Sequence, residues 1–183
     1  MEIFLKEPSI NEKNEIVKMC EELRNCDDEI KFEGASIFKD VVDENYDEWL
    51  QKVAQNKHIE DINPDLISQT TYVVVDETGH VYGGGNLRYR LNKNTINIGG
   101  HIGYALRPSD RGKGVGTRML PLFLEKANER GIEKVLLTCR ENNYASARVI
   151  EKNHGIKDTP APSRYEGILE SRYWIDVKKE LNK

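Results

Sequence analysis

Apolar residues recur at helical spacing in two segments of the first third of the chain. This spacing predicts amphipathic helices over residues 11–25 and 46–55, because positions three or four residues apart share one helix face. An alternating segment at residues 2–6 predicts a first strand, whereas residues 26–45 and 58–69 are polar and are expected to be irregular. The two apolar stripes are Ile16, Val17, Cys20 and Leu23, and Trp49, Leu50 and Val53.

The pattern then changes to that of a β-sheet. Residues 71–75 are rich in β-branched side chains and precede a turn signal at 76–79, so we predict a hairpin whose second strand covers residues 81–91. A further strand over residues 96–106 would complete an antiparallel meander. The glycine run at 83–85 predicts a bulge or a close backbone approach, with plain flexibility as the alternative.

A helix and a buried strand follow. The helix should run from residue 119 to about 130 and end at Gly131. Pro121 lies within it and predicts a kink or a late helix start, because proline lacks the N–H that an interior position needs. Residues 135–139 form a continuous apolar run, which is typical of a parallel strand covered on both faces.

The C-terminal part begins with a predicted helix over residues 144–153. Asn143 is its expected N-cap, and Gly155 is expected to end it. Residues 156–177 should supply two more strands, with an interruption at the prolines near 160–162.

Length and composition argue against several classes of protein. A chain of 183 residues suits one domain over residues 1–183, and a net charge of −4 disfavours a nucleic-acid partner. The three cysteines, Cys20, Cys26 and Cys139, have neither zinc-site nor disulfide spacing, so we expect no metal. No signal peptide or membrane-spanning run is evident. We therefore expect a soluble cytoplasmic protein without a membrane partner, and a homodimer is left open.

Residues 111–117 form the most informative motif of the chain. Arg111 opens the motif, three glycines alternate through it, and Thr117 closes it. A strand before it and a helix after it would place the motif at a helix N-terminus, where backbone N–H groups without intrahelical partners bind phosphate. Glycine lets the backbone approach such a ligand closely. The alternative is a glycine-rich connection without a ligand.

Two familiar phosphate motifs do not fit this segment. A Walker loop has lysine directly after its last glycine, but Lys113 precedes Gly114. A dinucleotide fingerprint would need a glycine where Thr117 stands. The order basic-x-x-Gly-x-Gly, read as Arg111, Gly114 and Gly116, instead resembles the acetyl-CoA pyrophosphate loop of the GNAT N-acetyltransferase superfamily.

The resemblance covers nearly the whole chain in element order and is most specific over residues 81–156. Residues 101–109 look like the strand that leads into the cofactor loop, and residues 139–155, which include Asn143, look like the second cofactor motif. The tail at 172–175 recurs in one group of bacterial members. The fold that the resemblance implies is α/β (α+β), with a mixed, mostly antiparallel twisted sheet flanked by helices.

The resemblance also implies a reaction. Such enzymes transfer an acetyl group from acetyl-CoA, a cosubstrate, directly to a primary amine without a metal. A backbone N–H near residues 104–106 would polarise the thioester oxygen. Asn143 would contact the pantetheine arm, with a plain N-cap as the alternative. The implied cofactor-binding residues are Tyr104, Ala105, Leu106, Arg111, Gly112, Lys113, Gly114, Val115, Gly116, Thr117, Asn143 and Ser146.

Two proton transfers need candidate residues. A primary amine with a pKa of about 10.4 must lose a proton, and His101 is the candidate base, with a structural histidine as the alternative. Many family members carry a tyrosine acid seven residues after the motif asparagine, but Ile150 occupies that position here. Ser146 is therefore the candidate acid for the departing thiolate, with Tyr144 in reserve. The alternative for Ser146 is a role in the helix cap alone.

The acceptor is the least specified part, because the N-terminal half matches the family only in element order. Acidic stretches at residues 27–29 and 40–48 would suit a small-molecule or peptide amine that is cationic, unless they are simply solvated surface. Two other functions stay open. One is a transferase of the same fold that uses another acyl-CoA, and the other is a non-catalytic CoA-binding or regulatory module.

Overall fold

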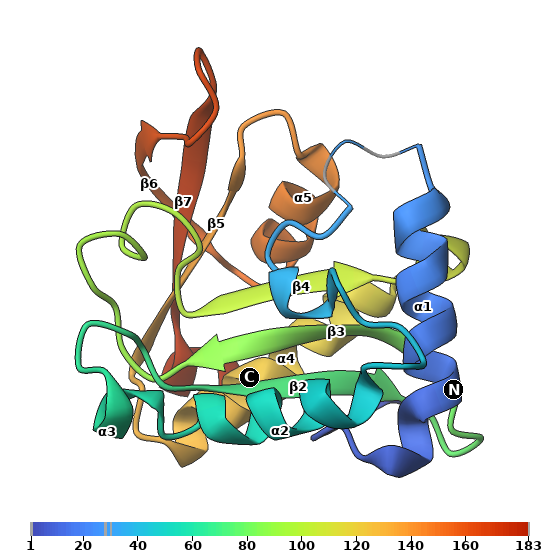
Figure 1. Cartoon of the computed structure of the whole chain (residues 1–183). Coiled ribbons are helices and arrows are strands. Elements are labelled where there is room, and N and C mark those ends of the chain that lie inside the picture. The colour runs from blue at the N-terminus through green and yellow to red at the C-terminus, as the bar shows by residue number, and fades with distance from the viewer. Residues whose placement is uncertain (1, 28, 30, 183) are drawn as a thin grey trace.

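Two antiparallel sheets form the centre of the computed structural model, which describes residues 2–27, 29 and 31–182 (Figure 1). The first sheet has the strand order β1-β2-β3-β4, and the second has the order β5-β7-β6. The strands are β1 (Phe4–Lys6), β2 (Gln69–Val75), β3 (Val81–Arg88), β4 (Ile102–Leu106), β5 (Lys134–Arg140), β6 (Ile156–Pro162) and β7 (Leu169–Asp176). The predicted fold class, a mostly antiparallel sheet flanked by helices, is confirmed.

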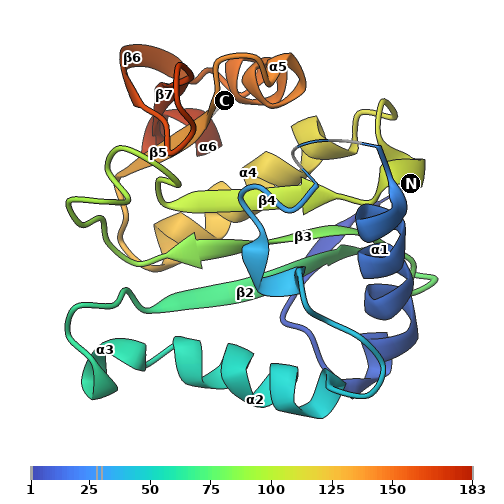
Figure 2. The ribbon, with the colours of Figure 1, turned by 45° about the horizontal axis from the view of Figure 1, so that its top comes forward.

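The helices cover both faces of the first sheet (Figure 2). On one face, Val73 and Val75 of β2 belong to a buried cluster with the apolar stripes of α1 and α2. On the other face, Tyr72 and Val74 belong to a cluster with α4 and the second sheet. The helices are α1 (Lys13–Asn25), α2 (Tyr46–Asn56), α3 (Ile59–Ile62), α4 (Val115–Glu129), α5 (Tyr144–Lys152) and α6 (Val177–Leu181), with short 3-10 turns η1 (Ile10–Glu12), η2 (Ser36–Phe38) and η3 (Pro108–Asp110).

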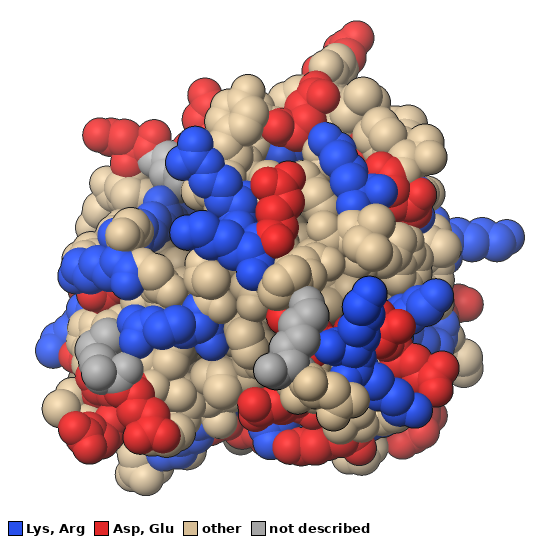
Figure 3. All heavy atoms as spheres, turned by 180° about the vertical axis from the view of Figure 1, so that it is seen from behind, with Lys and Arg blue, Asp and Glu red and all other residues tan. Residues whose placement is uncertain are grey.

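No helix within residues 2–27, 29 and 31–182 combines the length and the apolar character that crossing a membrane requires. Seen from behind the view of Figure 1, acidic and basic side chains are interspersed over the surface (Figure 3).

The glycine run of β3 marks a close backbone approach, as one of the predicted alternatives had it. A Cβ atom on Gly83 would lie 2.5 Å from the carbonyl oxygen of Ala105, and one on Gly85 would lie 2.4 Å from that of Gly103. A Cβ atom on Gly84 would lie 2.5 Å from the ring of Phe38. These glycines therefore let β4 and η2 pack tightly on β3.

Helix α4 begins at Val115, so the late start predicted from Pro121 is wrong. A proline at 121 leaves the carbonyl of Thr117 without its usual helical donor. The side chain of Asn153 supplies a replacement, with Nδ2 3.2 Å from the Thr117 oxygen. The missing bond is thus replaced from outside the helix, by the residue that ends α5.

Several other predictions need correction. The segment before β4 forms turns rather than an early strand, because the side chain of Asn92 accepts hydrogen bonds from the backbone N–H groups of Asn94 and Thr95. The short helices α3 and α6 were not predicted, and residues 160–162 lie within β6 beside a register shift. The ladder partner of β5 is β7, which is antiparallel, so β5 is not paired in the parallel manner that its apolar run suggested.

The end of α5 also differs from the prediction. His154, not Gly155, adopts the left-handed conformation, with φ of 59°. Gly155 is required for another reason, since a Cβ atom there would lie 2.4 Å from the side chain of Ile150.

Candidate active site

Strands β4 and β5 touch at one end and then separate. The backbone N–H of His101, just before β4, donates to the carbonyl of Leu136 in β5 at 2.8 Å. The N–H of Leu136 returns a hydrogen bond to Nδ1 of His101 at 3.0 Å. Beyond this junction β4 and β5 are paired in different sheets, and we call the region between their diverging C-terminal halves the opening.

The register of β4 directs alternate peptide groups into this opening. The carbonyl of His101 and the N–H of Arg107 both bond to β3, at 2.7 and 2.8 Å. Because peptide groups alternate along an antiparallel strand, those of Tyr104 and Leu106 point away from β3. The carbonyl of Leu106 accepts a hydrogen bond from Nε of Arg111 at 3.2 Å, in agreement with this direction. The N–H of Tyr104 can therefore meet a ligand between the strands.

The glycine-rich loop lies directly after β4 and at the start of α4. Gly112 and Gly114 have φ values of 75° and 77°, which is the left-handed region that favours glycine. A Cβ atom on either residue would meet nothing within 4 Å, so the loop faces open space. Gly114 is the N-cap of α4 and leaves the first N–H groups of the helix without a side-chain cap. These groups are suited to an anion such as pyrophosphate.

Gly116 has a different role from the other two glycines of the loop. It is buried, and a Cβ atom there would lie 3.0 Å from the side chain of Val149. This glycine lets α4 pack closely against α5, so the alternating pattern combines a ligand-facing function with a packing function.

A chain of polar side-chain contacts joins the glycine loop to α1. Lys113 lies 2.9 Å from Asp110, whose other oxygen lies 2.7 Å from Nε2 of His80. Nδ1 of His80 lies 3.2 Å from Glu15, which also binds Arg107 at 2.7 Å. Lys113 was expected to offer its charge to phosphate, and the structure shows that Asp110 already shares that charge.

Tyr104, Ser146 and Cys139 gather at the opening from three elements. The hydroxyl groups of Tyr104 and Ser146 lie 3.3 Å apart. Burial raises the pKa of Tyr104 to about 12, against a lowering by the bond to Ser146. Burial likewise raises the pKa of Cys139 to about 11, again opposed by a hydrogen bond with Ser146. All three side chains are therefore protonated at neutral pH.

The second predicted motif lies beside this group. Oδ1 of Asn143 accepts a hydrogen bond from the backbone N–H of Ser146 at 3.1 Å, so Asn143 is an N-cap of α5. Tyr144, the reserve acid, is 69% exposed. Ser146 therefore lies closer to the reacting region than Tyr144.

The geometry of His101 argues against the role of general base. Its Nδ1 lone pair accepts the N–H of Leu136, so in the neutral ring the proton is on Nε2 and no ring nitrogen is free to take another. Burial, aided by the charge of Arg88, lowers the pKa of His101 to about 4. The structural alternative therefore describes His101 better, as a residue that fixes the junction of β4 and β5.

Three residues on the far side of the opening were not singled out from the sequence. Arg140, at the end of β5, forms an ion pair with Glu33, and its guanidinium lies 3.8 Å from the ring centre of Tyr165. Arg140 directly follows an apolar strand, which is the one sequence signal that it carries. Glu33 and Tyr165 lie in connections with no motif, so the sequence alone could not bring them together.

The acidic residues predicted near the acceptor lie elsewhere. Asp40, Asp43, Glu44, Asp47 and Glu48 are exposed around the start of α2, and Asp43 pairs with Lys13 at 3.1 Å. Of the stretch at 27–29, Asp28 lies outside the described residues. Solvated surface describes the α2 group better than an acceptor site does.

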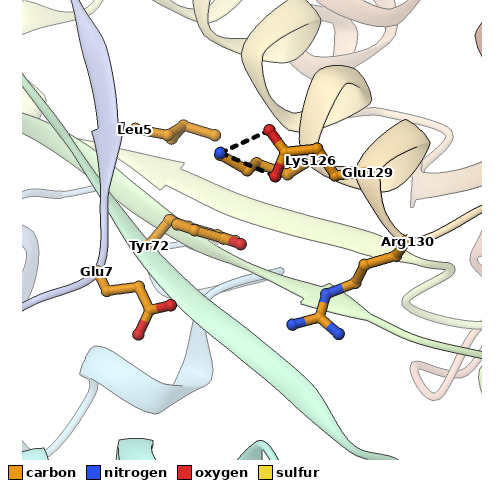
Figure 4. A pocket seen from close by; sticks show the side chains of 6 residues that line it. All are labelled: Leu5, Glu7, Tyr72, Lys126, Glu129 and Arg130. Atoms are coloured by element: carbon orange, nitrogen blue, oxygen red, sulfur yellow. Dashed lines mark hydrogen bonds and ion pairs between the residues drawn. The ribbon is translucent and has the colours of Figure 1, made fainter.

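A separate hollow of about 490 Å³ lies between β1, β2 and the end of α4 (Figure 4). Within it, Lys126 binds both carboxylate oxygens of Glu129, at 2.8 and 3.0 Å. The glycine loop begins α4, whereas this hollow lies near the other end of the helix, so the two regions are distinct. The lining residues are Leu5, Glu7, Tyr72, Lys126, Glu129 and Arg130.

Comparisons with known proteins agree with this arrangement. Residues 16–155 match the model of the acetyltransferase (GNAT) domain family. No curated protein matches the chain by sequence.

Three solved structures illustrate the similarity in fold. The spermidine N-acetyltransferase from Vibrio cholerae, in complex with CoA and spermine, has a TM-score of 0.64 at 17% identity, over 98% of both chains. A ribosomal L7/L12 alpha-N-protein acetyltransferase in complex with coenzyme A has a TM-score of 0.67 at 16% identity, over 95% of this chain and 93% of that one. The ribosomal-protein-S5-alanine acetyltransferase from Vibrio fischeri has a TM-score of 0.67 at 14% identity, over 97% and 94%. With a family match that spans most of its length, this chain belongs to the GNAT family of acetyltransferases, enzymes that use acetyl-CoA.

Proposed function

We propose that this enzyme moves the acetyl group of acetyl-CoA directly onto the nitrogen of a primary amine. The observation that carries the proposal is the opening between β4 and β5, which meets the open glycine loop at the start of α4. The three structural relatives named above support it, since each is named as an acetyltransferase and the names of two of them specify transfer to nitrogen.

The residues around the opening suit the parts of acetyl-CoA. The N–H groups of residues 112–117 would hold the pyrophosphate, with the positive end of the α4 dipole behind them. The N–H of Tyr104 would donate to the thioester oxygen, which gains negative charge in the transition state. The loop follows β4 directly through η3, so one extended molecule would meet both groups.

The transfer needs few protein groups. The amine nitrogen attacks the acetyl carbon, a C–N bond forms, the C–S bond breaks and the sulfur leaves as a thiolate. The attacking amine loses its proton to water, because His101 has no free lone pair. The hydroxyl of Tyr104 or Ser146 supplies the proton for the thiolate.

The test is a thiol-release assay with acetyl-CoA and a panel of primary amines. We expect CoA to be released only in the presence of an amine, with the acetylated amine identified by mass spectrometry. Propionyl-CoA in the same assay measures the preference for the acyl chain. Tight binding of acetyl-CoA without transfer to any amine would contradict the proposal and favour a non-catalytic CoA-binding module.

A further inference from the structure

Arg88 lies beside the opening on the face of the first sheet that α1 and α2 cover. Gly84, four residues earlier in β3, faces Phe38 of the α1–α2 cluster, and side chains two and four residues apart in a strand share a face. Arg88 is also the cross-strand neighbour of His101, since its N–H donates to the His101 carbonyl at 2.7 Å. Its guanidinium thus stands near the junction of β4 and β5.

The charge of Arg88 is not neutralised by a carboxylate. Nη1 donates to the carbonyls of Gly99 and Gly100, both at 3.1 Å, and these partners carry no charge. Within the described part of the chain no carboxylate forms an ion pair with it. Burial lowers the pKa of Arg88, and the nearby positive charge of Arg164 lowers it further.

Arg164 is close enough to Arg88 for the two charges to interact, and Arg140 ends β5 on one side of the opening. Arg164 lies in the connection between β6 and β7, together with Tyr165. Arg140 is only 6% exposed, and its Nε has no hydrogen-bond partner. Its ion pair with Glu33, which precedes η2, links the two sides of the opening. Figure 1 shows the connection before η2 and the β6–β7 hairpin rising on the same side of β4.

The charges around the opening do not balance. Glu33 compensates Arg140, and Glu170, buried behind it, accepts a hydrogen bond from Ser163 at 2.7 Å. Among the residues that the structure describes, neither Arg88 nor Arg164 forms an ion pair with a carboxylate. Arg88 is partly buried, and such a cation without a counter-ion is costly unless a ligand supplies the opposite charge, whereas the exposed Arg164 only adds positive charge nearby. The acceptor side of the opening is thus suited to an anionic group.

We infer that the acceptor amine carries a carboxylate, which binds Arg88 and Arg164 while the amine reaches the thioester at Tyr104. This inference rests on the proposed function and names the class of acceptor for the same opening. Tyr104 is three residue steps along the chain from His101, or roughly 10 Å, so the carboxylate and the amine are several bonds apart. Such an acceptor is opposite in charge to the cationic amine expected from the acidic stretches.

Three amines with the same carbon chain length test the charge directly. They are γ-aminobutyrate, with a carboxylate, n-butylamine, with no second charge, and putrescine, with a second amine. We expect kcat/KM to be highest for γ-aminobutyrate, by about tenfold or more over n-butylamine, because hydrogen bonds between charged groups are the strong ones. The C-terminally amidated dipeptides Ala-Glu, Ala-Gln and Ala-Lys, whose only possible carboxylate is the side chain of Glu, show in the same assay whether the carboxylate belongs to a peptide.

The variants Arg88→Gln and Arg164→Gln should remove most of this preference, mainly through KM. Arg88 also supports the loop at Gly99 and Gly100, so a fall in activity with all three amines could reflect a displaced loop. Arg164 is exposed and has no such role, and its variant keeps the inference testable. Lys178→Gln is the matched control. Lys178 lies on α6 and forms an exposed ion pair with Glu133, so this variant also removes one positive charge.

The outcomes separate the two proposals. Turnover of n-butylamine with putrescine preferred over γ-aminobutyrate would overturn the inference and leave the transferase function intact. An unchanged preference in both arginine variants would overturn it as well. No turnover of any amine, with acetyl-CoA still bound, would contradict both the inference and the proposed function.

Discussion

Nδ1 of His101 accepts the backbone N–H of Leu136 at 3.0 Å, at the point where β4 and β5 separate. The N–H of Leu136 thus bonds to a side-chain nitrogen instead of a backbone carbonyl, at the place where β4 and β5 last contact each other. The second bond, from the His101 N–H to the Leu136 carbonyl at 2.8 Å, completes the pair. The divergence of β4 from β5 therefore begins at a histidine whose ring bonds to β5.

Replacing His101 should show whether it acts in structure or in catalysis. His101→Ala leaves the buried N–H of Leu136 without an acceptor, so we expect a loss of about 1–3 kcal/mol in the free energy of unfolding. His101→Asn keeps an acceptor at a similar place and should retain most of the stability and turnover. Chemical denaturation and steady-state kinetics measure both. A base role would instead appear as a large loss of kcat in the stable Asn variant.

The lowered pKa of His101 gives a second test, through the dependence of stability on pH. Its pKa falls from 6.5 to about 4 on folding, so between these values the unfolded chain binds the extra proton. Stability from this group is complete above pH 6.5 and is lost as the pH falls towards 4. We expect the melting temperature of the wild type to fall more over this interval than that of His101→Asn. Parallel curves for the two proteins would contradict the assignment.

Arg107 predicts a further sensitivity to acid. Its guanidinium binds Glu15 at 2.7 Å and Glu22 at 2.6 Å. Burial would raise the pKa of each carboxyl group, but hydrogen bonds to Arg107, Lys18 and Ser109 lower them below the usual 4.5. The stability that these pairs contribute is present above about pH 4.5 and lost below it.

Arg107→Gln should therefore lower stability at pH 7 and flatten its decline in acid. Because the two glutamates are about a quarter to a third exposed, water can solvate them, and we expect a loss near the lower end of 1–3 kcal/mol. Unfolding curves at pH 7 and pH 3.5 measure the difference. Lys126→Gln, which removes an exposed pair with Glu129, should cause less than 1 kcal/mol at either pH.

Gly114 tests the binding of acetyl-CoA. Gly114→Glu should abolish the binding that calorimetry detects, because a carboxylate would stand where the pyrophosphate is expected. The space around the residue is open, so the side chain itself causes no clash in the free protein. Gly114→Asn is the matched control, since asparagine tolerates the left-handed φ of 77° better than other residues and adds no charge. Equal affinity in the Glu variant and the wild type would contradict the placement of the cofactor.

The sequence predicted those parts of the fold that local patterns encode. The stripes of α1 and α2, the glycine loop and the N-cap at Asn143 depend on neighbours within one helical turn, and the structure confirms them. The start of α4 was predicted wrongly because the partner of Thr117 is Asn153, which is far away in the sequence. A proline penalty that a distant side chain relieves cannot be recognised from the helix alone.

The candidate site divides in the same way. The phosphate loop is one short segment, so its glycines were readable as a motif. The surroundings of Arg88 come from two connections, around Gly99 and Arg164, which meet only in the folded chain. His101 illustrates a further limit, since a histidine on a strand looks the same in sequence whether its ring accepts a backbone N–H or a substrate proton.

The final prediction concerns the proton for the departing thiolate. Ser146 was the candidate acid from the sequence, and the structure adds the hydroxyl of Tyr104 at 3.3 Å from it. Burial raises the pKa of Tyr104 to about 12, so this hydroxyl carries its proton at neutral pH but is a weaker acid than an ordinary tyrosine, which limits the rate that it can contribute. The thiolate of CoA is a weak enough base to leave unaided, so each loss should be moderate.

We expect Tyr104→Phe and Ser146→Ala to lower kcat by about 10–100-fold, at or below the lower end of general acid catalysis, with little change in acetyl-CoA affinity. Because the two hydroxyls touch, the double variant should lose less than the product of the single losses. Tyr144→Phe, at an exposed position in the same helix turn as Ser146, is the matched control and should keep the wild-type rate. If Tyr104→Phe and Ser146→Ala both turn over like the wild type at saturating acetyl-CoA, the thiolate leaves into solvent without a protein acid.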